Sequence, residues 1–166
     1  MASTPPAAPL EIVQICAVVR DLRASVEAYH RTLGWGPWQA WVCTPPRHRD
    51  TMLRGKPVAF SMQLAETKVG GVTFELIEPL DGPSVYKEWL AERGEGLHHV
   101  ACLRADGDMD ATLADLRARG LEVLMSGTID GCAYYYFDTE PVLKLVVESF
   151  TGEYELGSPD WVYPEP

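Results

Sequence analysis

Two adjacent histidines, His98 and His99, lie in a largely apolar run, G-E-G-L-H-H-V-A-C-L over 94–103, that is typical of a β-strand. An imidazole enclosed by such a run needs a hydrogen-bond partner, a proton to exchange or a metal ion. Side chains alternate along a strand, so we expect the two rings on opposite faces, with one facing the interior. A core histidine satisfied by hydrogen bonds is the alternative, and the rest of the chain must distinguish the two.

Three more polar residues interrupt apolar strands. They are Gln14 in I-V-Q-I-C-A-V, Glu75 in T-F-E-L-I-E and Glu148 in L-V-V-E-S-F. A polar or charged group in such a position requires a partner or a cation. Each also has a structural alternative. The Gln14 amide could bond to backbone, and Glu148 could lie at a sheet edge beside Lys144. Glu75 could face solvent while Glu78 faces inward.

The elements that carry these residues occur twice. The first half follows the order strand, helix, strand, strand, strand, with Asp21 suited to cap its helix and Gly34 suited to end it. A loop rich in Pro and Arg, 44–56, precedes the last two strands. The predicted elements of this half are strands 12–19, 36–43, 57–64 and 72–78 and helix 22–33.

A helix over 82–94, for which Ser84 is a suitable N-cap, leads into a second run of the same order. Its predicted elements are strands 96–104, 121–129, 132–138 and 142–150 and helix 108–119. We therefore expect a disordered leader (1–9), a first module (10–80), a linking helix (81–94) and a second module (95–150). A tail (151–166) would follow and either close the fold or pack on a partner.

Superposing the two halves aligns the four polar residues in pairs. Gln14 falls over His99 with an offset of 85 residues, and Glu75 falls over Glu148 with an offset of 73. The difference is about the length of loop 44–56, which only the first half contains. Unrelated structural polar residues need not superpose under a repeat, so the repeat favours one shared site.

Composition excludes several classes of function. The formal net charge of −10 and pI near 4.8 disfavour nucleic acid and anionic membranes as partners. The start of the chain lacks the basic and apolar regions of a secretory signal, so we expect a cytoplasmic protein. The four cysteines are far apart and form no C-x-x-C pair, so we expect buried free thiols rather than a cysteine-based zinc site.

The element order, together with G-E-G-L-H-H-V-A and F-E-L-I-E-P-L, resembles the vicinal oxygen chelate superfamily, which includes glyoxalases, bleomycin resistance proteins and dioxygenases. The resemblance is strongest to its methylmalonyl-CoA epimerase and glyoxalase I branch and covers about residues 10–150. It implies an α+β fold in which two βαβββ modules form a cup-shaped mixed sheet, and a homodimer. It also implies one metal ion bound by Gln14, Glu75, His99 and Glu148.

Such a ligand set of oxygen and nitrogen suits divalent Zn, Co, Ni or Mn. A cation that binds a substrate carbonyl stabilises the enolate formed when the neighbouring carbon loses its proton. Glu75 and Glu148 come from different modules, so one could take the proton and the other return it on the opposite face. We therefore predict a metal-dependent epimerase or isomerase of a small carbonyl compound, with Glu75 and Glu148 as catalytic residues.

Two alternatives stay open, a glyoxalase-type lyase and a metal-free binding or resistance protein of the same fold. Gln14 in place of a first histidine disfavours a ring-cleaving dioxygenase. The epimerases usually carry His at the position of Gln14 and a further glutamate in the first module, and no such glutamate stands between Pro57 and Leu64.

Two other groups of residues bear on the substrate. The basic loop could bind a phosphate or carboxylate, although a solvated hairpin is the simpler interpretation. The aromatic residues could line a pocket, although core and dimer packing explains most of them, and only alternate tyrosines can face a cavity. The residues concerned are Arg47, His48, Arg49, Arg54 and Lys56 in the loop, and Trp35, Trp38, Trp41, Tyr134, Tyr135 and Tyr136 among the aromatics.

Overall fold

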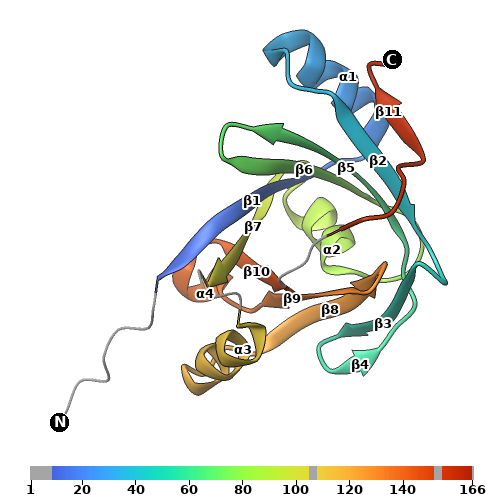
Figure 1. Cartoon of the computed structure of the whole chain (residues 1–166). Coiled ribbons are helices and arrows are strands. Elements are labelled where there is room, and N and C mark those ends of the chain that lie inside the picture. The colour runs from blue at the N-terminus through green and yellow to red at the C-terminus, as the bar shows by residue number, and fades with distance from the viewer. Residues whose placement is uncertain (1–8, 105–107, 152–154, 166) are drawn as a thin grey trace.

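The computed structural model describes residues 9–104, 108–151 and 155–165. The predicted leader therefore lies outside the described residues except for Pro9. Within the described residues, eleven strands form one mixed sheet that curls into a cup, in the order β11-β2-β5-β6-β1-β7-β10-β9-β8-β3-β4 (Figure 1). No helix of this described part is long and apolar enough to cross a membrane.

The first half of the sheet runs β2-β5-β6-β1, with β1 parallel to β6 and the other pairs antiparallel. Helix α1 packs on its outer face through Leu22 and Val26. The Asp21 carboxylate accepts a hydrogen bond from the Ala24 amide, and Gly34 ends the helix with φ 71°. The elements are β1 (Leu10–Val18), α1 (Leu22–Leu33), β2 (Trp38–Cys43), β5 (Met62–Val69) and β6 (Val72–Pro79).

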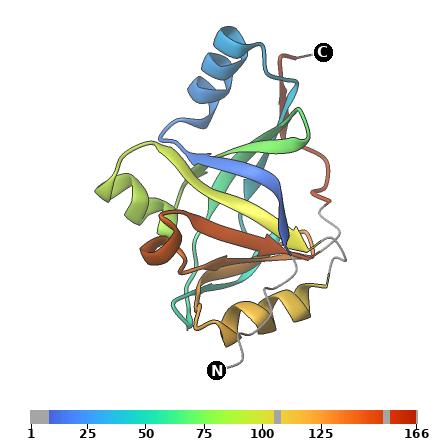
Figure 2. The same ribbon diagram turned by 90° about the vertical axis from the view of Figure 1, so that its left-hand side faces the viewer.

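The second half repeats this order as β7-β10-β9-β8, with β7 parallel to β10. An antiparallel pairing of β1 with β7 joins the halves. Helix α3 lies at the opposite end of the molecule from α1 (Figure 2). The predicted fold class, two βαβββ modules in a cup-shaped sheet, is confirmed. The elements are β7 (Gly96–Arg104), α3 (Met109–Ala118), β8 (Val123–Ile129), β9 (Cys132–Phe137), α4 (Glu140–Leu143) and β10 (Val146–Phe150).

The predicted loop 44–56 contains two strands, β3 (His48–Leu53) and β4 (Lys56–Pro57). β3 pairs with β8, so this insertion of the first half extends the sheet of the second half. The charged sequence of β3 hid it, because His48 is its one buried residue and the other side chains are exposed or half-buried. Cross-half pairing, and not local β-propensity, makes this segment a strand.

Two other boundaries differ from prediction. Residues 142–144 do not extend the last strand, because 142 and 143 belong to the short helix α4, which has Pro141 in its first turn, and Lys144 adopts a left-handed conformation after it. Lys144 therefore does not share a strand face with Glu148, and that alternative for Glu148 is wrong.

The strand predicted at 57–64 is β5, which reaches Val69. The linking helix is α2 (Val85–Glu92), with the Ser84 hydroxyl accepting from the Lys87 amide.

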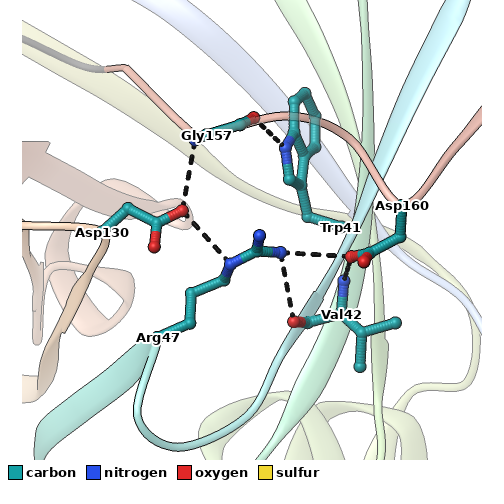
Figure 3. A network of polar contacts seen from close by, with 6 residues as sticks. All are labelled: Trp41, Val42, Arg47, Asp130, Gly157 and Asp160. Atoms are coloured by element: carbon teal, nitrogen blue, oxygen red, sulfur yellow. Dashed lines mark hydrogen bonds and ion pairs between the residues drawn. The ribbon is translucent and has the colours of Figure 1, made fainter.

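The described part of the tail packs on its own chain. β11 (Trp161–Tyr163) pairs with β2. Before it, the Trp41 indole donates to the Gly157 carbonyl at 2.7 Å (Figure 3). Arg47 forms ion pairs with Asp130 at 3.2 Å and Asp160 at 3.1 Å, which links the first half, the β8–β9 turn and the tail (Figure 3).

Candidate metal and proton-transfer site

Three of the predicted ligands meet in the interior of the cup. His99 Nε2 lies 3.1 Å from Glu148 Oε2 and 3.6 Å from Glu75 Oε2. The side chain of the fourth, Gln14, lines the same small cavity as Glu75 and Glu148, which measures about 20 Å³. All four residues are at least 95% buried. The cavity has room for one water molecule or one metal ion.

The strand registers show that the four residues occupy equivalent positions in the two halves. Gln14 pairs with Thr73 across the parallel strands β1 and β6, and Glu75 stands two residues further along β6. His99 pairs in the same way with Val146, and Glu148 stands two residues further along β10. The two halves therefore present Gln14 and His99, and Glu75 and Glu148, as matched pairs around the interior.

Two β-bulges flank these positions. The register between β1 and β7 shifts at Val13 and at His98, the residues directly before Gln14 and His99. A bulge places two residues opposite one and redirects a side chain. The prediction that His98 and His99 face opposite sides is therefore wrong. Both rings are buried on one side, with their Nδ1 atoms 2.8 Å apart.

Tyrosines form much of the remaining wall. Tyr136 Oη lies 3.4 Å from His99 Nε2 and accepts a hydrogen bond from the Tyr86 hydroxyl at 2.8 Å. Tyr134 lies beside them and contacts His48 Nε2 at 2.8 Å. Tyr134 and Tyr136 face the cavity, whereas Tyr135 packs in a separate cluster, as strand alternation predicts. Tyr86 also lines the cavity. Burial raises the pKa of Tyr86, Tyr134 and Tyr136 well above the usual value, so their hydroxyls stay protonated.

The buried charges at this site interact strongly. Burial alone would lower the pKa of His99, but the carboxylates of Glu148 and Glu75 outweigh it and raise that pKa to about 9. Burial raises the pKa of Glu148 despite the opposing effect of His99. Within the described residues, Glu148 Oε2 accepts no well-aligned hydrogen bond, although it is buried. Such an oxygen is suited to bind a cation, so these residues fit a divalent metal ion.

Sequence reasoning missed Cys16 as a possible ligand. Its Sγ, a carboxylate oxygen of Glu75 and a ring nitrogen of His99 all lie within 4.8 Å of one another. Burial and the nearby carboxylates, Glu75 first, raise the pKa of the Cys16 thiol well above its usual value. Strand alternation could have revealed it, because Cys16 follows Gln14 by two residues and therefore faces the same side of β1. The four cysteines are free and buried, as predicted.

Sequence reasoning also missed Glu66. Its carboxylate accepts a hydrogen bond from the Gln14 amide, Nε2 to Oε1, at 2.8 Å. The predicted strand ended at Leu64, whereas β5 continues to Val69 and carries Glu66 near its middle. The Gln14 side chain therefore bonds to a carboxylate, and the first half does contain a glutamate beside the site.

The basic loop and the tryptophans serve mainly structural roles. Arg47 pairs with two carboxylates, as described above, Arg49 pairs with Asp50, and Arg54 makes two contacts to Glu88. The phosphate hypothesis for this loop thus gains no support. Trp38 is fully buried in the core under α1, and Trp35 packs against the same core. A wider hollow of about 500 Å³ lies between β2, β5 and the tail, lined in part by Trp41, Glu66 and Lys68.

A curled sheet of two βαβββ halves around a buried histidine and two carboxylates is the cup-shaped α+β architecture of the glyoxalase type. Residues 13–137 match the family model described as the Glyoxalase/Bleomycin resistance protein/Dioxygenase superfamily. The chain therefore belongs to that superfamily. A comparison with curated proteins finds no match.

Several solved structures of methylmalonyl-CoA epimerases share the fold. A variant from Streptomyces coelicolor in complex with 2-nitronate-propionyl-CoA is 27% identical, with 89% of this chain and 97% of that chain covered and a TM-score of 0.60. A methylmalonyl-CoA epimerase in complex with methylmalonyl-CoA and NH4+ is also 27% identical, with 90% and 99% covered and a TM-score of 0.59. The epimerase from Mycobacterium tuberculosis, at 22% identity, 84% and 85% coverage and a TM-score of 0.59, shows the fold alone.

Proposed function

We propose that this protein is a metal-dependent epimerase or isomerase that removes and returns a proton at the carbon next to a carbonyl group. One observation carries the proposal. Two buried carboxylates from different halves, Glu75 and Glu148, flank one nitrogen of His99, and one oxygen of Glu148 accepts no well-aligned hydrogen bond among the described residues. A purely structural ion pair has no need of a second carboxylate.

Gln14, Glu75, His99 and Glu148 are the residues that would hold the metal, with Zn, Co, Ni or Mn as suitable ions. When bound, a divalent ion would polarise the substrate carbonyl and stabilise the negative charge that develops on its oxygen. Burial of the four residues keeps bulk water away from the reacting carbon. The same burial strengthens every electrostatic interaction in the site.

The proton transfers fall to the two carboxylates. Glu75 lies on β6 and Glu148 on β10, so they approach the cavity from the two different halves of the sheet. Removal of a proton by one and its return by the other would invert the carbon between them. Burial raises the pKa of Glu148 toward the range in which a carboxylate can both accept and donate a proton. Glu66 is a third carboxylate in this region and accepts a hydrogen bond from Gln14.

The substrate proposal combines cavity size with the structural neighbours. The cavity at the carboxylates, about 20 Å³, has room for the metal ion, and the wider hollow of about 500 Å³ between β2, β5 and the tail could take the body of a substrate. The two epimerases described above at 27% identity were, like others, solved with acyl-CoA compounds, so 2-methyl-branched acyl-CoA thioesters are the first substrates to try. Homodimer formation and a cytoplasmic location remain predictions.

The decisive experiment follows the α-proton in D2O by NMR, with purified protein loaded with each candidate metal. The panel contains acyl-CoA thioesters, 2-oxoaldehydes with a thiol and cyclic ketones. Exchange with recovery of both epimers supports the proposal, and net conversion of the aldehyde adduct would identify a glyoxalase-type lyase instead. Glu148→Gln should abolish exchange, while Glu92→Gln, at an exposed site on α2, should not. Tight binding of intact ligand without exchange would contradict an enzyme.

A further inference from the structure

Cys16 occupies a distinctive position between two of the proposed ligands. Across the parallel pair β1 and β6 it stands opposite Glu75, and across the antiparallel pair β1 and β7 it stands opposite His99. Its counterpart in the second half is Ala101, which stands opposite Glu148 and Gln14 in the same registers. Both are fully buried. One of two equivalent positions thus carries a methyl group and the other a thiol.

The distances around Cys16 are close to those of a metal site. Its sulfur, a Glu75 oxygen and a His99 nitrogen lie within 4.8 Å of one another. Metal bonds of about 2.0–2.3 Å place ligand atoms roughly 3.5 Å apart in a tetrahedral site, so movements of about 1 Å would suffice. A second observation points to a cation here, since the buried Glu148 oxygen that lacks a well-aligned hydrogen bond in the described chain lies 3.1 Å from His99.

We propose that the Cys16 sulfur is a direct ligand of the metal ion, so that the site of this chain combines sulfur, imidazole and carboxylate donors. This inference rests on the proposed function, because it concerns the same metal. The equivalent Ala101 cannot bind a metal, so the ion would lie nearer to the first half of the sheet. Glu75, His99 and Glu148 would complete the set, and Gln14, whose amide donates to Glu66, would lie at its margin.

A sulfur ligand changes which metal the site prefers. Thiolate favours zinc, cobalt and cadmium, whereas an all-oxygen and nitrogen set also accommodates manganese and magnesium. Only the deprotonated thiol binds, so the S–H bond breaks, a metal–sulfur bond forms and the proton leaves to the buffer. Metal binding should therefore release one more proton per chain when Cys16 is present than when it is replaced.

The experiment adds Co²⁺ to the metal-free full chain under a non-thiol reductant and records the absorption spectrum. Thiolate bound to cobalt gives an intense near-ultraviolet charge-transfer band that oxygen and nitrogen ligands do not give. We expect the band in the wild-type protein and in Cys102→Ser, whose cysteine packs outside the cup. We expect its loss in Cys16→Ser, with metal affinity at least roughly tenfold weaker.

A second variant keeps the test independent of how well Cys16→Ser folds. In the triple variant Cys43→Ala/Cys102→Ala/Cys132→Ala, Cys16 is the one remaining cysteine of the chain. The charge-transfer band should persist there and should saturate at one cobalt ion per chain. Stoichiometric cobalt binding by the wild-type protein without the band would overturn the role of Cys16 and leave the metal-dependent function standing. Absence of cobalt, zinc, nickel and manganese binding would overturn both.

Discussion

His98 and His99 are neighbours in the sequence, yet their Nδ1 atoms lie 2.8 Å apart in the interior. Two ring nitrogens in hydrogen-bond contact require that one carries a proton and the other accepts it. Burial, and then the nearby charge on His99, lower the pKa of His98 well below its usual value, which makes His98 a neutral acceptor. His99 then donates from Nδ1 and keeps Nε2 directed at the carboxylates.

This relationship predicts that His98 positions the His99 ring for metal binding. His98→Ala removes the acceptor of the His99 Nδ1 proton, so metal affinity should fall roughly 10- to 100-fold. Isothermal titration with Zn²⁺ measures the change. His98→Asn offers an oxygen acceptor at the same position and should recover part of the affinity. Equal affinities in wild type, His98→Ala and His98→Asn would show that the contact does not orient the ligand.

How far the sequence predicted this site depends on the kind of information involved. The repeat aligned Gln14 with His99 and Glu75 with Glu148, and the strand registers show the same correspondence. A correspondence between residues so far apart in the chain can be predicted from the sequence because a duplicated module repeats its pattern of apolar residues. The duplicated βαβββ order followed from the same repeat, whereas the cup-shaped sheet was implied by the resemblance to the superfamily.

What could not be predicted depends on pairing between strands that are distant in sequence. The bulge at His98 arises from the register of β7 against β1, so strand alternation gave the wrong face for that ring. β3 is a strand because β8 pairs with it, and its charged sequence gives no local signal. Glu66 was missed because a boundary error of a few residues removed it from its strand.

The two carboxylates and the histidine should have separable effects. His99→Ala removes the shared nitrogen and leaves Glu75 and Glu148 as neighbouring buried carboxylates, so metal content should fall well below one per chain. Glu148→Gln keeps an oxygen donor and should retain more metal, while α-proton exchange drops at least about 100-fold. Mass spectrometry of metal content and NMR exchange measure the two effects. Undiminished exchange in Glu148→Gln would remove that residue from the mechanism.

His48 should make the fold less stable in mild acid. It is buried beside Tyr134, and burial lowers its pKa to about 4 from an ordinary value near 6.5. The unfolded chain therefore binds the proton more readily than the folded chain does. The free energy of unfolding consequently contains a term from neutral His48 that is fully present above pH 6.5 and is lost as the pH falls toward 4. The largest loss of unfolding free energy from this cause is about 3 kcal/mol. Chemical unfolding of wild type and His48→Gln at pH 7 and pH 4.5 should show a smaller loss in the variant; parallel losses would rule this residue out as the cause.

Arg47 should hold the tail against the rest of the molecule. It pairs with Asp130 and Asp160 while partly buried (Figure 3). The Arg49 pair with Asp50, in contrast, is largely exposed. Arg47→Ala leaves two carboxylates without their cation and frees the segment that bonds to Trp41, so we expect a loss of about 1–2 kcal/mol in unfolding free energy. Hydrogen exchange in β11 should accelerate in the same variant. Arg49→Ala, the matched control, should change neither quantity measurably, and equal effects of the two substitutions would mean that the tail is held by β-pairing alone.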